Sequence, residues 1–161
     1  MVKVHPDWLV LNRGINGQRS DQVQSRFARD VLGERPQYVI VLAGVNDIYQ
    51  GRRPVAVQGN LASMYDHARA ASIIPVAATV LPYDTATSGE AAAIRELNRW
   101  IEATANTRGI PYCDTHRVVA DPQNPDRLAG SPDGLHPDVA AYRRMGEALA
   151  RTIEEDLRRR S

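Results

Sequence analysis

The segment Asp133-Gly134-Leu135-His136-Pro137 places a carboxylate and an imidazole three residues apart in a turn that contains glycine. A carboxylate beside a histidine fixes the tautomer of the imidazole and stabilises its charged form, so that the imidazole can take a proton from a nucleophile. The two side chains are therefore two-thirds of a hydrolytic triad. Because Asp-Gly turns are also common on protein surfaces, a plain surface turn stays equally open from the spacing alone. No serine of the chain stands where such a pair would need one.

Two further polar clusters follow apolar runs of strand length. Gly17 ends the stretch Asn12-Arg-Gly-Ile-Asn-Gly and comes just before a predicted helix, so its backbone N–H can serve as an anion donor. Asn46, in Gly-Val-Asn-Asp, carries an amide that can donate a hydrogen bond to a developing oxyanion. A structural interpretation stays open for both: a tight turn at Gly17 and an Asx turn at Asn46. We expect the neighbouring Asp47 to brace its loop.

Metal binding is the competing use of the same side chains. Asp133 and His136, joined by His116 or Asp114, could assemble a zinc or manganese site. These residues lack the tight ligand spacing of a known metal motif, so the sequence predicts neither a metal nor another cofactor. The single cysteine, Cys113, lies in a short apolar run and is interpreted as a core residue.

Strand-length apolar runs alternate with helical patterns, and this alternation positions the polar clusters. Strands are predicted at residues 8–11, 38–42, 74–80 and 110–114, and helices at residues 20–32, 56–72, 90–107 and 139–159. Such alternation indicates a three-layer α/β/α fold with a parallel sheet, in a single domain of residues 1–161. Ligands of these sheets bind at the carboxyl ends of the strands, which is where the clusters fall. The long connection 117–138 is of a length that is uncommon without a functional role.

Composition excludes several classes of protein. Hydrophobic residues make up 43% and charged residues 24% of the chain, as in ordinary globular domains, and the net charge of +1 implies no strong field for nucleic acid. No apolar stretch is long enough to span a membrane. The first residues do not read as a signal peptide, so a cytoplasmic location is the default expectation, and the oligomeric state is not readable.

Taken together, the three clusters resemble the sequence blocks of the SGNH (GDSL-type) hydrolases. Residues 12–18 are similar to the second block, whose glycine supplies an oxyanion N–H; Gly17 would hold that role. Gly44-Val-Asn46-Asp47 matches the third block, whose asparagine is another oxyanion donor, and Asp133-Gly-Leu-His136-Pro matches the fifth block, whose aspartate and histidine complete a triad. The resemblance extends from about Pro6 to the last helix and implies a flavodoxin-like parallel sheet.

The chain departs from the family pattern at one place. The family begins with a strand that ends in Gly-Asp-Ser, whose serine is the nucleophile, and this sequence has no such block. Residues 4–8 resemble the lead-in to the family's second strand, so the domain is expected to be N-terminally incomplete, with its first, central strand absent. Ser20, in a glycine-rich connection, is the best substitute nucleophile, although an N-cap role for it is the simpler interpretation. Ser131 is close to Asp133 but would have to face its own histidine.

The resemblance implies a serine ester hydrolase that acts through an acyl-enzyme on a small-molecule ester, with its nucleophile block outside this chain. The alternative is a non-catalytic relative that binds an ester or carbohydrate ligand. The residues expected to line the pocket follow the second and third predicted strands: Tyr49, Gln50, Arg52, Pro82, Tyr83 and Asp84.

Overall fold

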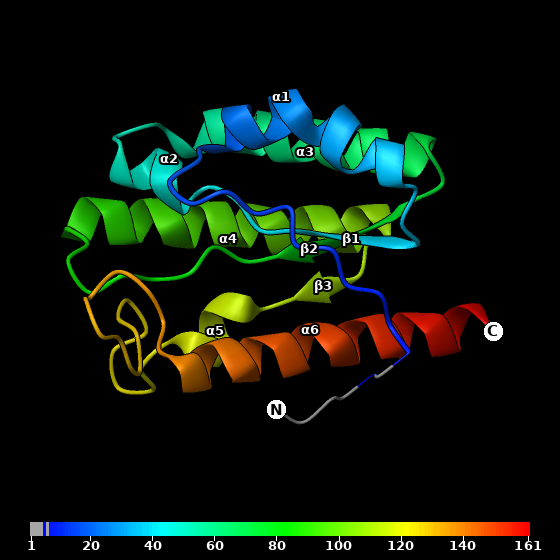
Figure 1. Cartoon of the computed structure of the whole chain (residues 1–161). Helices are drawn as coiled ribbons and strands as arrows, with labels where there is room; N and C mark the ends of the chain where they lie inside the picture. Colours follow the sequence, from blue (N-terminus) through cyan, green and yellow to red (C-terminus); the bar gives the residue numbers. More distant parts are fainter. Residues whose placement is uncertain (1–4, 6) are drawn as a thin grey trace.

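The computed structural model describes residue 5 and residues 7–161, which form one parallel sheet between layers of helices (Figure 1). The elements in chain order are α1 Ser20–Asp30, the 3-10 helix η1 Leu32–Glu34, β1 Tyr38–Val41, α2 Val45–Tyr49, α3 Pro54–Ala70, β2 Ile74–Ala78, α4 Ser88–Arg108, β3 Tyr112–Cys113, α5 Thr115–Val119 and α6 Val139–Arg160. The predicted α/β class and the four long helices are confirmed, with ends displaced by at most two residues. The short helices α2 and α5 have no counterpart among the predicted elements.

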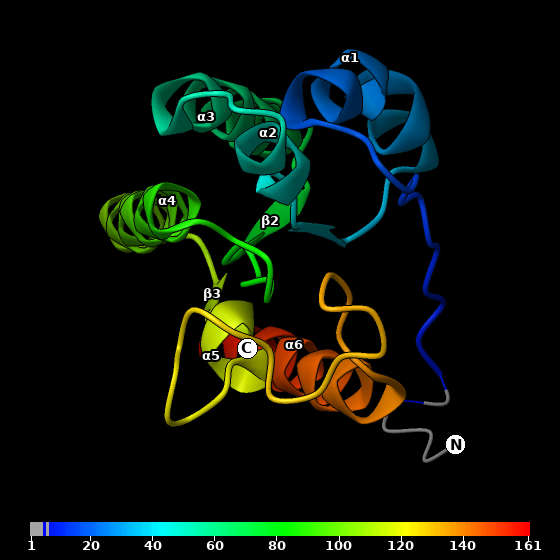
Figure 2. The same cartoon turned by 90° about the vertical axis from the view of Figure 1, so that its left-hand side faces the viewer.

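The sheet has three parallel strands in the order β1-β2-β3, with Tyr38 opposite Ile74 and Ala77 opposite Tyr112. Helices α1, α3 and α4 lie on one face of the sheet, and α5 and α6 on the other (Figure 2). The first face carries the main core, in which the fully buried side chains include Val57, Leu61 and Leu97. None of the described helices is both long and apolar enough to cross a lipid bilayer.

The strand predicted at residues 8–11 does not form, and this prediction is wrong. Leu9 is 86% and Val10 77% exposed, and in the described residues neither pairs with a strand. The segment runs alongside the sheet but apart from β1 (Figure 2). A strand is held by the ladder of a neighbouring strand, and no strand of the described chain stands between this segment and β1. The predicted lead-in, residues 4–8, lies partly outside the described residues.

The α6 side of β1 is only partly covered. Val39 and Val41 pack in the main core, so Tyr38 and Ile40 point to the opposite face because side chains alternate along a strand. Tyr38 is covered there, since its hydroxyl donates to Asp156 of α6 at 2.9 Å, but Ile40 is 42% exposed. A parallel strand is normally buried on both faces, so β1 lacks neighbours on one side.

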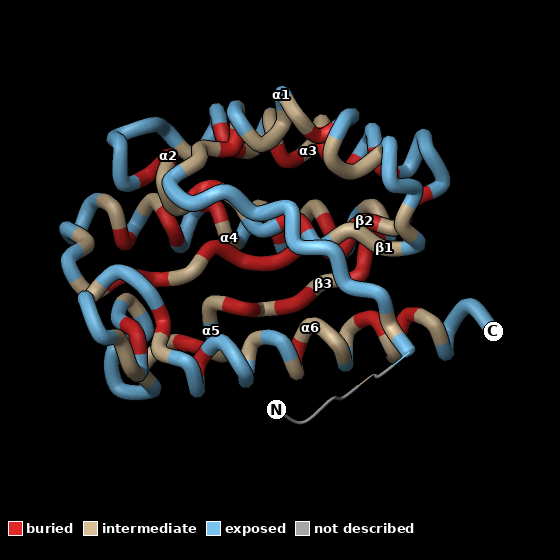
Figure 3. Tube along the Cα trace, in the orientation of Figure 1, coloured by how far each residue is buried: buried red, intermediate tan, exposed pale blue. Residues whose placement is uncertain are grey.

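Helix α6 shows the same lack of cover at its N-terminal end. Helical spacing puts Tyr142 on the same side of α6 as Ile153, eleven residues further on, yet Tyr142 is 45% exposed whereas Ile153 is buried. The tube of Figure 3 shows mostly exposed residues where α6 begins. Helix α6 packs against α5 and β3, at the far edge of the sheet from β1. The inward face of α6 therefore extends past the elements available to bury it.

Candidate active site

The turn that carries Asp133 and His136 is built locally. Oδ2 of Asp133 lies 2.7 Å from Nδ1 of His136, and Oδ1 accepts the backbone N–H groups of Leu135 and His136 at 2.9 and 2.8 Å. The glycine between them, Gly134, has φ +75°, a conformation that other residues rarely adopt. The carboxylate therefore holds the imidazole by Nδ1, and the His136 side chain is 54% exposed. In the described chain, no hydrogen bond engages Nε2.

Ser131 braces this turn, a role that was not predicted from its place in the sequence. Its hydroxyl donates to the carbonyl oxygen of His136 at 2.7 Å and accepts the N–H of Gly134 at 2.8 Å. The hydroxyl is thus engaged with the backbone of its own turn, which argues against Ser131 as a substitute nucleophile. The signal was present in the sequence, because serine hydroxyls commonly bond to backbone groups a few residues away.

The pKa of Asp133 lies well below its ordinary range. The main cause is the hydrogen bond from the His136 side chain, followed by those from the backbone N–H groups of His136 and Leu135. All three donors favour the charged carboxylate. Asp133 therefore stays ionised throughout the neutral range, as a group that orients an imidazole must.

Removing the imidazole is expected to raise the pKa of Asp133 toward its ordinary value of about 3.9. In His136→Ala the two backbone donors persist, so the pKa should rise only part of the way. A ¹³C NMR titration of the Asp133 carboxyl measures it directly. Because the pKa of Asp133 is lower in the folded protein than in the unfolded chain, ionisation of this carboxyl stabilises the folded state. The stabilisation is complete at pH values above the unfolded-state pKa and is lost as the pH falls toward the folded-state pKa. An unchanged Asp133 titration in His136→Ala would contradict the pairing, and His67→Ala, on the exposed face of α3, is the control.

Gly17 and Asn46, predicted from separate clusters, come together. The side-chain amide of Asn46 donates to the carbonyl oxygen of Gln18, next to Gly17, at 3.0 Å. An amide NH₂ has two donors, so one N–H is left after this bond. Gly17 has φ +75°, and within the described chain no acceptor engages its backbone N–H. Gly17 therefore adopts the turn conformation of the structural interpretation, and it also has the available N–H that an anion donor needs.

Asp47 braces this half of the site, as predicted, and it does so through Ser20. The Asp47 carboxylate accepts the backbone N–H of Ser20 at 2.7 Å and its hydroxyl at 2.8 Å, and Asn60 donates to the same hydroxyl at 2.9 Å. Ser20 is fully buried and is the first residue of α1, whose N-cap is Arg19. The N-cap prediction for Ser20 is therefore wrong. As a nucleophile it is equally unsuited, because its hydroxyl is enclosed and already bonded.

The two halves lie at the same end of the molecule. The turn before α1, helix α2 and the connection before α6 all lie beyond the carboxyl ends of the strands (Figure 1). Within the described residues no hydrogen bond joins Asp133 or His136 directly to Gly17 or Asn46. The arrangement therefore places an imidazole held by a carboxylate and two available N–H groups, those of Asn46 and Gly17, at the same end of the sheet.

The other predicted groups lie elsewhere. His116 belongs to α5, where its ring nitrogens contact the carbonyl oxygens of Val80 and Pro125 at 2.9 and 2.8 Å. In the described part of the chain, no three potential metal-binding side chains converge.

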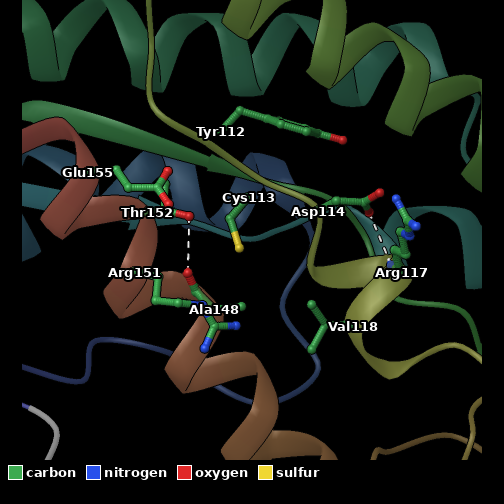
Figure 4. A pocket seen from close by; sticks show the side chains of 9 residues that line it. All are labelled: Tyr112, Cys113, Asp114, Arg117, Val118, Ala148, Arg151, Thr152 and Glu155. Atoms are coloured by element: carbon green, nitrogen blue, oxygen red, sulfur yellow. Dashed lines mark hydrogen bonds between the residues drawn. The ribbon is translucent and has the colours of Figure 1, made fainter. Parts of the chain in front are cut away.

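A cavity of about 420 Å³ opens between β3, α5 and α6, and Cys113 and Arg151 are among the side chains that line it (Figure 4). Burial raises the pKa of the Cys113 thiol, in keeping with a core residue rather than a nucleophile.

Comparison with known proteins identifies the family. The model of the GDSL-like lipase/acylhydrolase family matches residues 2–144. A crystal structure of a GDSL-like lipase from Bacteroides thetaiotaomicron superposes with a TM-score of 0.80 at 30% identity, covering 89% of this chain and 75% of that one. Esterase TesA of Pseudomonas aeruginosa is 28% identical over 156 residues, or 92% of this chain and 71% of that protein.

A shorter match covers the uncharacterised lipoprotein YqeF of Bacillus subtilis, 33% identical over 79 residues, which are 45% of this chain and 32% of that protein. The chain thus spans about a third of this relative's length and about three quarters of the Bacteroides lipase. Since the family model covers most of the sequence, the chain belongs to the GDSL-like lipase/acylhydrolase family.

Proposed function

We propose that this chain carries the acid–base and oxyanion-binding parts of a serine ester hydrolase, and that the serine is presented by a strand beside β1. The observation that carries the proposal is the Asp133–His136 pair, held at 2.7 Å through Nδ1, with no hydrogen bond on Nε2 within the described residues. Membership of an acylhydrolase family makes an ester the expected substrate.

The residues divide the reaction as follows. A serine Oγ attacks the acyl carbonyl while Nε2 of His136 takes its proton, and Asp133 stabilises the resulting imidazolium. The oxyanion accepts hydrogen bonds from the remaining N–H of the Asn46 amide and from the N–H of Gly17. Collapse of this intermediate breaks the ester C–O bond, and the alcohol leaves with the proton from Nε2. Water then attacks the acyl-serine, again with His136 as base, and releases the acid.

The place for the serine follows from the uncovered edge of the sheet. Ile40 on β1 is exposed, and so are Leu9 and Val10 in the segment that runs apart from β1. The carboxyl end of β1, at Val41, is followed by α2, the helix that carries Asn46. A parallel strand inserted between β1 and the segment of Leu9 and Val10 would complete the ladder of β1 and end at the same edge of the sheet as Asn46. Burying an exposed Ile or Leu side chain contributes about 1.5–3 kcal/mol, so such a strand has a driving force to dock.

The proposal can be tested by extending the chain at its N-terminus with a strand and a helix. One variant carries an apolar strand that ends in Gly-Asp-Ser, and its matched control ends in Gly-Asp-Ala. With p-nitrophenyl acetate as substrate, we expect the serine variant to exceed the alanine control by at least about 10³-fold in kcat/KM. Both variants should melt at a higher temperature than the unextended chain, because both cover the same apolar surface.

Two outcomes would overturn the proposal. Equal and negligible turnover by both extended variants, with the rise in melting temperature intact, would reject the catalytic role and favour the non-catalytic binding alternative. Turnover by the unextended chain that persists in Ser20→Ala and vanishes in His136→Ala would show that the serine needs no added strand.

A further inference from the structure

One hydrogen bond joins the turn of Asp133 and His136 directly to the loop that follows β2. Within the described residues, the only hydrogen bond from residues 130–137 to a residue outside the connection 121–138 joins the Gly134 carbonyl to the backbone N–H of Asp84, at 2.7 Å. The other hydrogen bonds of the turn are internal or lead to Asp138. Asp84 and its neighbours therefore link the turn of His136 directly to the end of β2.

The side chain of Asp84 adds a second link to the same connection. Its Oδ1 accepts the backbone N–H of Leu128 at 2.8 Å, so the one residue holds the connection at two points on either side of Ser131. The turn also lies against this loop, since a Cβ placed on Gly134 would be in ordinary van der Waals contact with Cβ of Asp84, at 3.6 Å, and the methyl carbon of Thr85, at 3.8 Å. Leu128 is itself buried against Val119 and Ala141, which anchors this end of the tether.

The residue before Asp84 reaches the other half of the site. Tyr83 is 2% exposed, and its ring lies edge-on to that of Tyr49 with the centroids 5.8 Å apart. Tyr49 is the last residue of α2, the helix that carries Asn46. Tyr83 and Asp84 are adjacent in the loop that follows β2. Tyr83 contacts α2, the helix that carries Asn46, and Asp84 contacts the turn that carries His136.

We infer that Asp84 is a positioning residue that sets the place of His136 relative to Asn46 and to an incoming serine. The inference deepens the proposed function and rests on it. A carboxylate is not required for the link to Leu128: an amide oxygen at the same position accepts the same hydrogen bond. Asp84→Asn should therefore keep the turn in place. Asp84→Ala retains the backbone bond to Gly134 but removes the acceptor of the Leu128 N–H, so the connection is held at one point instead of two.

The position of the turn can be measured in the chain as it is, without any activity. In the native protein we expect an NMR cross-relaxation signal between the Gly134 Hα protons and the Thr85 methyl group. The signal should be retained in Asp84→Asn and lost or at least halved in Asp84→Ala. Asp126→Ala is the matched control, because Asp126 ties the same connection to Arg95 of α4 at a point away from the turn. A signal unchanged in Asp84→Ala, or lost equally in Asp126→Ala, would overturn the inference.

Kinetics supply a second readout in the serine-extended enzyme. A base displaced by about 1 Å costs on the order of 10²-fold, so Asp84→Ala should lower kcat about 10- to 100-fold and leave KM within about threefold. Asp84→Asn should restore kcat, and Asp126→Ala should not change it. Equal kcat values in Asp84→Ala and the parent would contradict the inference. If the extended parent is inactive, the proposed function fails, while the cross-relaxation signal still decides the role of Asp84.

Discussion

Replacing His136 with alanine in the serine-extended enzyme is expected to lower kcat by about 10⁵-fold and to leave KM almost unchanged. Within the described turn, the imidazole is the group that a braced carboxylate holds in place, through the 2.7 Å contact of Nδ1 with Asp133. Without it the serine keeps its proton, because no other base of the described turn can take it. The loss therefore falls on the chemical step and not on substrate binding.

Asp133 and His136 act as one unit, so their effects should not add. Asp133→Asn is expected to lower kcat by about 10⁴-fold, and the double variant should be no slower than His136→Ala alone. Steady-state kinetics on an activated acetyl ester measure all three variants. His67→Ala, on the exposed face of α3, serves as the control for removing an imidazole. Turnover of His136→Ala within about tenfold of the parent would exclude His136 as the base.

Gly44→Ala is expected to destabilise the protein by about 3 kcal/mol, the largest effect that we anticipate for a single added methyl group. Gly44 has φ +128°, and a Cβ there would lie 2.9 Å from Cγ1 of Val57, 3.0 Å from Cδ2 of Leu97 and 3.2 Å from Cγ2 of Val80. All three neighbours are buried, so none can move aside freely. Backbone strain and overpacking therefore act at the same residue.

Urea denaturation measures this loss as a lower transition midpoint at an unchanged slope, and the melting temperature should fall by about 10 °C. The matched control is Gly59→Ala on the exposed face of α3, where an added Cβ meets no atom within 4 Å. That substitution should stabilise the protein by about 0.5–1 kcal/mol, because glycine is unfavourable within a helix. Equal midpoints for Gly44→Ala and the native chain would show that the turn after β1 adapts to a side chain.

Features that depend on neighbours in sequence were predictable. The four long helices follow from apolar spacing and from local caps, such as Thr87 with Glu90 at the start of α4 and Gly109 at its end. The Asp133–His136 pair is also local, since its bonds close within one turn of the chain. The family resemblance needed this turn together with the Gly17 and Asn46 clusters, and each of the three is a short local motif.

Features that depend on partners distant in sequence were not predictable. Residues 8–11 have the composition of a strand but lie exposed, because the described chain supplies no ladder beside them. Ser20 has the sequence context of an N-cap or a nucleophile, yet Asp47 and Asn60 enclose its hydroxyl from 27 and 40 residues away. Tyr142 follows the apolar period of α6 but its side chain stays 45% exposed.

The sequence by itself thus determined the α/β class, the acid–histidine turn and the glycine and amide that match an oxyanion site. Only the tertiary structure decided that Asn46 meets the Gly17 turn, that Asp84 ties the His136 turn to the sheet, and that the edge of β1 is open. The physical reason is that a turn or a helix closes its own hydrogen bonds within a few residues. A sheet edge and the spacing between two halves of a site are set by segments that the local pattern does not specify.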